Sequence, residues 1–183
     1  WVFSGEQYVY SEDGSILKLR NYDLKNNLEY RVDYYKNNIK KSESCYVIGS
    51  SIKEGMFATY DKGGFLIEKS YYKDNSLNGI EEIYENKKII SQTKYKNNQK
   101  DGVEKKYIDG IISIESNYIL DEKDGVEKVY NKDGEVEYTI FYKKGNIEKV
   151  LYKNKELTKD EKIIIKDFSG KKHLEFALKN LKL

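Results

Sequence analysis

Short segments of this chain alternate apolar and polar residues, and similar segments recur at a fixed spacing. Alternation with a period of two places successive side chains on opposite faces of a strand, so the pattern predicts β-strands. Residues 78–84, 101–107 and 124–130 show it most clearly, each beginning with a turn dipeptide and ending in tyrosine. The recurring tyrosines form a first column, Tyr10, Tyr34, Tyr60, Tyr84, Tyr107 and Tyr130, and a second column, Tyr22, Tyr46, Tyr72, Tyr95, Tyr118 and Tyr142.

Steps within each column are 23 or 24 residues, except one of 26 that spans residues 47–54. A period of this size indicates one small structural unit stacked about six times. Stacked units place activity on an extended surface rather than in a single buried pocket.

Residues that tolerate a positive φ angle separate the predicted strands. Asn-Gly or Asp-Gly stands at 78–79, 101–102 and 124–125, and such dipeptides favour tight reversals. A further turn follows each first-column tyrosine, at 13–14, 37–38, 63–64, 86–87, 109–110 and 133–134. Turn residues also stand three positions after most second-column tyrosines, at Gly49, Asn75, Asn98, Asp121 and Gly145. We therefore expect one antiparallel hairpin per unit, with the least regular turn where Glu29 replaces the glycine.

The alternation also predicts which side chains share a face. Aliphatic residues stand six positions before most second-column tyrosines and one position after most unit glycines, and polar residues fill the positions between them. We therefore expect one tyrosine–aliphatic face and one charged face. The predicted fold is all-β: an elongated, single-layer antiparallel ribbon of about six stacked hairpins, twisted or trough-shaped. The candidate partner-binding or repeat-packing residues are Tyr60, Tyr72, Tyr84, Tyr95, Tyr107, Tyr118, Tyr130 and Tyr142.

The C-terminal segment departs from the repeat. We assign residues 1–152 to the array, with a degenerate seventh unit near Tyr152, and residues 153–183 to a cap. Leu174, Ala177, Leu178 and Leu181 follow helical spacing after Ser169, which suits an N-cap, so an amphipathic helix is expected over 170–183. This helix would cover the last unit, and the alternative is a basic helix that binds a membrane or a partner.

Composition narrows the functional classes. Charged residues make up 35% of the chain and the mean hydropathy is −0.82, but 14% aromatic residues and a strict repeat favour a folded protein. A net charge of +2 gives no reason to expect nucleic-acid binding. Lysines outnumber acidic residues by twelve to six over residues 143–183. That segment is either a solvated basic end or a contact for an acidic partner or membrane.

No motif for catalysis emerges from the sequence. His173 is the single histidine and has no neighbouring nucleophile, and Cys45 is the single cysteine. The Asp-rich turns lack the first acidic ligand of a calcium loop. The carboxylates Glu81, Glu104 and Glu127 form a repeated column, which we interpret as part of a solvated charged face. We therefore expect no enzyme activity, no cofactor and no metal site.

The repeat resembles the variant MORN repeat of many bacterial proteins. Residues 101–110 and 124–134 are similar to the family's D-G-x-x-x-x-Y-x-x-x-G element, and residues 95–98 to its Y-x-N-G element. The resemblance covers about residues 5–145 and implies a non-catalytic interaction module. It implies a protein partner, as in antitoxin-like members, or alternatively phospholipid binding at a membrane surface.

The first residue of the chain is Trp1 rather than Met, from which we expect that a leading segment has been removed, either an export signal or residues beyond the boundary of the expressed piece. For a bacterial protein, this favours an exported or cell-envelope location over a cytoplasmic one.

Overall fold

A computed structural model describes residues 5–156 of the chain. Its contacts divide the chain into two compact units, residues 1–99 and 100–183, which we describe separately. Both are built of antiparallel β-strands, and the only helix among the described residues is the 3-10 turn Lys36–Asn38. The prediction of an all-β, hairpin-rich antiparallel protein is therefore confirmed.

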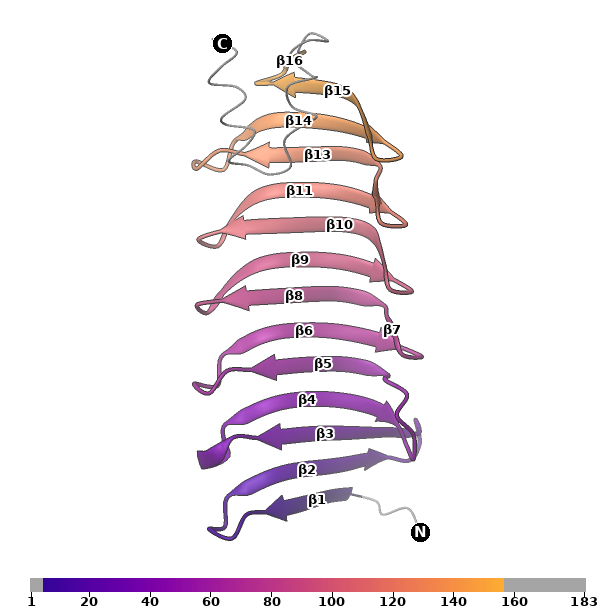
Figure 1. The fold of residues 1–183 in the computed structure, drawn as a ribbon, viewed down its shortest axis with the longest axis vertical. Coiled ribbons are helices and arrows are strands. Elements are labelled where there is room, and N and C mark those ends of the chain that lie inside the picture. Colours follow the sequence, from indigo (N-terminus) through magenta and orange to yellow (C-terminus); the bar gives the residue numbers. More distant parts are fainter. Residues whose placement is uncertain (1–4, 157–183) are drawn as a thin grey trace. The chain divides into compact units, whose positions relative to one another are not determined.

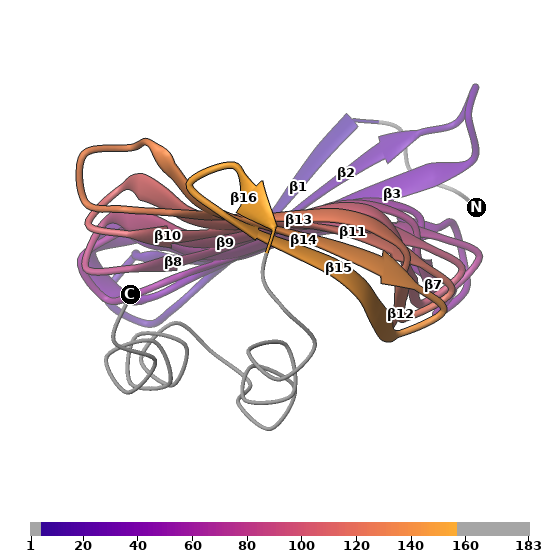
Figure 2. The ribbon, with the colours of Figure 1, turned by 90° about the horizontal axis from the view of Figure 1, so that it is seen from above.

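The first unit contains nine strands, which Figure 1 shows in chain order from indigo to magenta. They are β1 (Gly5–Tyr10), β2 (Ile16–Asp23), β3 (Leu28–Tyr34), β4 (Lys40–Val47), β5 (Gly55–Tyr60), β6 (Leu66–Lys73), β7 (Ser76–Leu77), β8 (Gly79–Glu85) and β9 (Lys88–Lys96). Each long strand pairs with the one before it, and the short β7 pairs with β6. Viewed from above, β1 to β3 fan away from the later strands of this unit, as expected for a twisted sheet (Figure 2).

The second unit continues the pattern with seven strands. They are β10 (Gln99–Ile108), β11 (Ile111–Ile119), β12 (Glu122–Lys123), β13 (Gly125–Tyr130), β14 (Val136–Lys143), β15 (Asn146–Tyr152) and β16 (Lys155–Glu156). Strands β11, β13, β14 and β15 pair in that order, and β12 pairs with β11. The predicted cap, residues 153–183, begins within the described residues, where β16 pairs with β15. The rest of it, including the predicted helix over 170–183, lies outside the described residues.

The register within the hairpins repeats closely. Most unit glycines pair with the second-column tyrosine of the same hairpin: Gly5 with Tyr22, Gly55 with Tyr72, Gly79 with Tyr95, Gly102 with Tyr118 and Gly125 with Tyr142. Glu29, which replaces the glycine, pairs with Tyr46 in the same way. The repeated sequence therefore produces a repeated pairing.

A β-bulge interrupts each hairpin next to the first-column tyrosine. In the hairpin of β10 and β11, Lys106 pairs with Ile114 but Tyr107 pairs with Ile112, which leaves Ser113 as an extra residue. The same shift occurs beside Tyr10, Tyr34, Tyr60, Tyr84 and Tyr130. An extra residue reverses the alternation of side chains beyond it.

The bulge corrects the prediction of a single tyrosine–aliphatic face. Tyr118 pairs with Gly102 and therefore shares a face with Glu104, whereas Tyr107 lies on the opposite face with Val103. Ile112 lies with Tyr107, although its spacing from Tyr118 in the sequence predicted a shared face. Within each unit the two columns define a first-column face and a second-column face.

The predicted reversals at Asn-Gly and Asp-Gly are also wrong. The chain reverses earlier, at 74–75, 97–98 and 120–121, where both residues have positive φ. Residues 101–102 instead lie inside β10, and Asn78 donates its backbone N–H to Tyr71 O at 2.7 Å. Gly79 has φ +133°, and a Cβ added there would lie 3.0 Å from the Tyr71 Cβ. Gly79 therefore allows a close approach between strands rather than a turn.

Candidate binding surface

The eight candidate tyrosines divide between the two faces. Tyr60, Tyr84, Tyr107 and Tyr130 lie on first-column faces, and Tyr72, Tyr95, Tyr118 and Tyr142 lie on second-column faces. All eight side chains are half-buried. Within each of the two units, the two sets lie on opposite sides of the strands and therefore cannot form one continuous contact surface.

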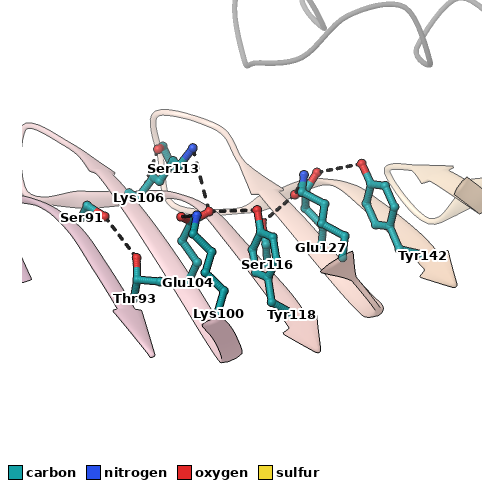
Figure 3. A network of polar contacts seen from close by, with 11 residues as sticks. Ser91, Thr93, Lys100, Glu104, Lys106, Ser113, Ser116, Tyr118, Glu127 and Tyr142 are labelled. Carbon is teal, nitrogen blue, oxygen red and sulfur yellow. Dashed lines mark hydrogen bonds and ion pairs between the residues drawn. The ribbon is translucent and has the colours of Figure 1, made fainter. Parts of the chain in front are cut away.

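On the second-column face of the second unit, Glu127 is the centre of a polar network (Figure 3). Its side chain is buried, with 6% of the residue exposed. Ser116 Oγ donates to one carboxylate oxygen at 2.6 Å, Tyr142 Oη donates to the other at 3.3 Å, and the Lys123 ammonium group pairs with the carboxylate. The Lys123 ammonium also lies over the Tyr142 ring, 4.9 Å from its centroid. Three donors therefore replace the water that this carboxylate loses.

Glu104 repeats the arrangement one hairpin earlier. Lys100 Nζ lies 2.6 Å from Glu104 Oε1 and 4.9 Å from the Tyr118 ring centroid. Tyr118 Oη donates to Glu104 Oε2 at 3.2 Å, and Lys106 Nζ lies 3.9 Å from the same oxygen. Burial opposes ionisation of Glu104, but the lysine and tyrosine contacts outweigh it and lower its pKa on balance.

The predicted solvated carboxylate column is therefore wrong for Glu104 and Glu127. Both carboxylates are buried and paired, because the lysine two positions before each glycine reaches over the neighbouring tyrosine to meet them. Glu29 is also buried in the first unit, where Arg31 Nη2 lies 2.8 Å and Arg20 Nε 3.5 Å from its oxygens. These carboxylate contacts link neighbouring strands within each of the two units.

Beyond Glu127, the second-column face becomes apolar. Val129, Tyr138, Ile140 and Val150 form a buried cluster. The Tyr138 and Tyr152 rings stack at 5.0 Å between centroids. This cluster is the main hydrophobic core among the described residues of the second unit.

The first-column face has a different character. Tyr60 Oη donates to Glu43 Oε2 at 2.5 Å, and burial together with this carboxylate raises the pKa of Tyr60 to about 12. Each first-column tyrosine pairs across its bulge with Ile16, Lys40, Leu66, Ile89, Ile112 or Val136. Ile80 and Val103 remain more than a third exposed on this face. Tyrosine–aliphatic pairs therefore recur beside most bulges on this face, in addition to the cluster around Tyr138 on the second-column face.

The first unit contains a groove of about 270 Å³ on its second-column face. Tyr46, Phe57 and Tyr72 form one side, with the Phe57 ring edge-on to both neighbours at 5.2 and 4.9 Å between centroids. Lys53 Nζ lies 4.4 Å from the Tyr72 centroid, and the Arg31 guanidinium lies 4.0 Å from that of Tyr46. This side of the groove is aromatic and positively charged.

The rest of the groove has small and acidic side chains. Its lining includes the hydroxyl residues Ser42, Ser44, Thr59 and Ser70. Asp33 and Glu68 line it as well, and Asp33 Oδ1 is buried with no hydrogen bond from the described residues, although Arg20 lies 3.7 Å away. The groove therefore combines an aromatic, cationic part with an acidic part.

Sequence reasoning missed this groove, although one signal was present. Two residues after the repeat glycine stand Glu81, Glu104 and Glu127 in three hairpins, Gln7 in the first hairpin and Phe57 in the hairpin of β5 and β6. A change from a carboxylate to an aromatic side chain in this repeated column marks a hairpin with different local chemistry.

Other candidate chemistries receive no support from the described residues. Residues 5–156 contain no group of three or more His, Cys, Asp or Glu side chains arranged to hold a metal ion. Cys45 is buried on the face opposite Tyr46, and burial raises the pKa of its thiol. Over the same residues, no helix has the length and apolar character needed to cross a bilayer. His173 lies outside the described part of the chain.

Comparisons with known proteins give no family assignment. The sequence matches no family model and no curated protein. Twenty-one chains of solved structures match, among them one described as "Crystal structure of GtfA/B complex". That match has 10% sequence identity and a TM-score of 0.24, covers all of this chain and spans only 24% of the other. A TM-score this low carries no argument about fold or function, so the MORN resemblance stays a prediction.

Proposed function

We propose that this chain is a non-enzymatic scaffold of about six MORN-type hairpin units that binds a protein partner through its second-column face. The observation that carries the proposal is the groove bounded by Tyr46, Phe57 and Tyr72. Aromatic side chains provide large contact areas at little entropic cost, and they are enriched where proteins recognise one another.

The lining of the groove favours recognition over chemistry. Its hydroxyl and carboxylate groups can form hydrogen bonds to a backbone or to polar side chains, while the aromatic rings pack against aliphatic groups. The extended strands beneath it suit an extended ligand segment, since side chains on one face of a strand repeat every ~7 Å. The phospholipid alternative involves the ribbon together with the basic residues of 143–183, most of which lie outside the described part of the chain.

Affinity capture from the source cell, followed by measurement of complex mass in solution, tests the proposal. We expect a protein partner in fixed stoichiometry with the wild-type chain. Glu68→Lys should weaken that complex, because Glu68 lines the groove and makes no hydrogen bond or ion pair with the described residues. Glu12→Lys, an exposed turn substitution, is the matched control and should bind like wild type.

A complex that tolerates Glu68→Lys as well as Glu12→Lys would exclude the groove as the contact surface. Capture of anionic lipid vesicles at low salt, with no protein partner, would instead support the phospholipid alternative.

A further inference from the structure

The two units share one set of hydrogen-bond donors but differ in its acceptor. In the second unit, the Glu127 carboxylate accepts from the Ser116 hydroxyl, the Lys123 ammonium and the Tyr142 hydroxyl. These three donors come from three neighbouring strands, β11, β12 and β14, and converge on β13. Together they form a carboxylate-binding site that the chain fills with its own side chain.

The first unit has the same donors at the matching positions. Lys53 pairs with Tyr46 as Lys123 pairs with Tyr118, and its ammonium lies over the Tyr72 ring. The pairing of Glu43 with Ala58 places Ser44 beside residue 57. By the same register, the pairing of Glu115 with Lys128 places Ser116 beside Glu127. The donor set Ser44, Lys53 and Tyr72 is therefore equivalent to Ser116, Lys123 and Tyr142.

In the first unit, no carboxylate among the described residues accepts hydrogen bonds from these three donors. Phe57 occupies the position of Glu127, since it follows Gly55 by two residues as Glu127 follows Gly125. Among residues 5–156, the side-chain donor atoms of Ser44, Lys53 and Tyr72 make no hydrogen bond or ion pair, and the contacts of the Lys53 ammonium are with aromatic rings. All three residues line the groove. The unmatched donors thus face a space that a ligand can enter.

We propose that the groove binds an acidic side chain of an extended segment in the protein partner, with its carboxylate at Ser44, Lys53 and Tyr72. This inference rests on the proposed function and names the chemistry that the partner must supply. The ligand carboxylate takes the role that Glu127 has in the second unit, where three charge-assisted or hydroxyl donors hold it.

The acidic part of the groove adds a second requirement. Glu68 pairs with Thr59, two residues along β5 from Phe57, so its carboxylate lies roughly 7 Å further along the strand. In an extended ligand, side chains two residues apart share a face and have the same spacing. A segment with an acidic residue, one intervening residue and then a basic residue therefore matches the donor set and Glu68. Asp33 and Glu68 also disfavour a doubly charged phosphate, which would meet like charges in the same groove.

A peptide titration tests the proposal without knowledge of the partner. The probe is acetyl-Ala-Glu-Ala-Lys-Ala-amide, and the matched control replaces its Glu with Gln. NMR shift changes of the backbone amides at Ser44, Lys53 and Tyr72 report binding. We expect the Glu peptide to bind about tenfold or more tightly than the Gln peptide, because the control loses the charge-assisted hydrogen bonds.

Two variants make the test specific. Phe57→Glu supplies an internal carboxylate to the donor set and should reduce Glu-peptide binding about tenfold or more. Lys53→Gln removes the cation and should do the same, which covers the case in which the first variant does not fold. Lys149→Gln removes a lysine from the first-column face of the second unit and should bind like wild type. Equal binding of the Glu and Gln peptides, or undiminished binding by folded Phe57→Glu, overturns the proposal.

Partner capture separates this inference from the proposed function. If a partner is captured equally by wild type, Phe57→Glu and Lys53→Gln, the scaffold function stands and the carboxylate site is wrong. If no protein is captured but the Glu peptide binds selectively, the scaffold proposal fails and the site remains.

Discussion

Removal of the Lys123 ammonium group should destabilise the second unit far more than removal of an ordinary surface lysine. Lys123→Met keeps the length and apolar character of the side-chain stem but leaves the buried Glu127 carboxylate without its cation. A broken buried pair costs about 3–5 kcal/mol, whereas an exposed pair contributes about 0–1 kcal/mol.

The exposure of this pair decides between those limits. The Lys123 and Glu127 side chains are 31% and 8% exposed, so the pair is intermediate, and we estimate a loss of about 2 kcal/mol. The contact between the ammonium and the Tyr142 ring adds about 0.5–1 kcal/mol. Lys149 and Glu156, at 44% and 53% exposure, provide the control, and Lys149→Met should cost about 0.5 kcal/mol or less.

Urea unfolding followed by far-UV circular dichroism and tyrosine fluorescence measures these losses. The double variant Lys123→Met with Glu127→Leu should recover about half of the loss, because an apolar pair leaves no unpaired buried charge. Equal effects of the Lys123 and Lys149 substitutions would refute the reasoning. So would a double variant that is less stable than Lys123→Met alone.

Three more outcomes follow from contacts elsewhere in the two units. The pKa of Glu104 is lowered in the folded state, so the stability that its carboxylate contributes is present above the unfolded value of 4.5 and is lost as pH falls through the folded value. In the Glu104→Gln variant, the urea midpoint should therefore change less between pH 5 and pH 3 than it does in the wild type. Tyr60 should titrate near pKa 12, followed by NMR of its labelled ring, and Glu43→Gln should move that pKa toward 10, whereas an unchanged pKa would show that burial alone raises it. Gly79→Ala should lower the free energy of unfolding by about 2–3 kcal/mol, because φ is positive there and the added Cβ makes a short contact. Gly14→Ala should lower it by only about 1 kcal/mol, because its added Cβ meets nothing within 4 Å. Equal thermal shifts for the two glycine variants would rule out the packing contribution.

The strands and their pairing were predictable because they depend on local chemistry that the repeat shows many times. Tyrosines spaced by 23 or 24 residues and turn residues with positive φ fix where each hairpin begins and reverses. The position of the reversal was misjudged at 78–79, because glycine serves equally well for a turn and for close contact between strands. Those two uses differ only in what the neighbouring strand places opposite the glycine.

The faces could not be assigned by counting, since one bulge residue reverses the parity. Adjacent aliphatic pairs such as Leu66 and Ile67 are a trace of this, because two successive apolar residues break the alternation at the bulge. The burial of Glu104 and Glu127 was missed for another reason. Their burial depends on lysines and hydroxyl groups of neighbouring strands, and on each lysine ammonium group lying over a tyrosine ring.

The bulges also separate two kinds of length change in this chain. An insertion in the turn between a first-column tyrosine and its bulge lengthens the loop without altering the side chains of either face, which is consistent with tyrosine-to-tyrosine steps of both 11 and 12 residues. A deletion of the bulge residue, such as Ile67, would transfer every later side chain of that strand to the other side of the sheet. Gain or loss of one residue in the turn therefore leaves both faces unchanged. The same change at the bulge, a few residues away, exchanges the side chains of the two faces. Engineers who recombine such hairpins can use the bulge as the boundary that must be kept intact.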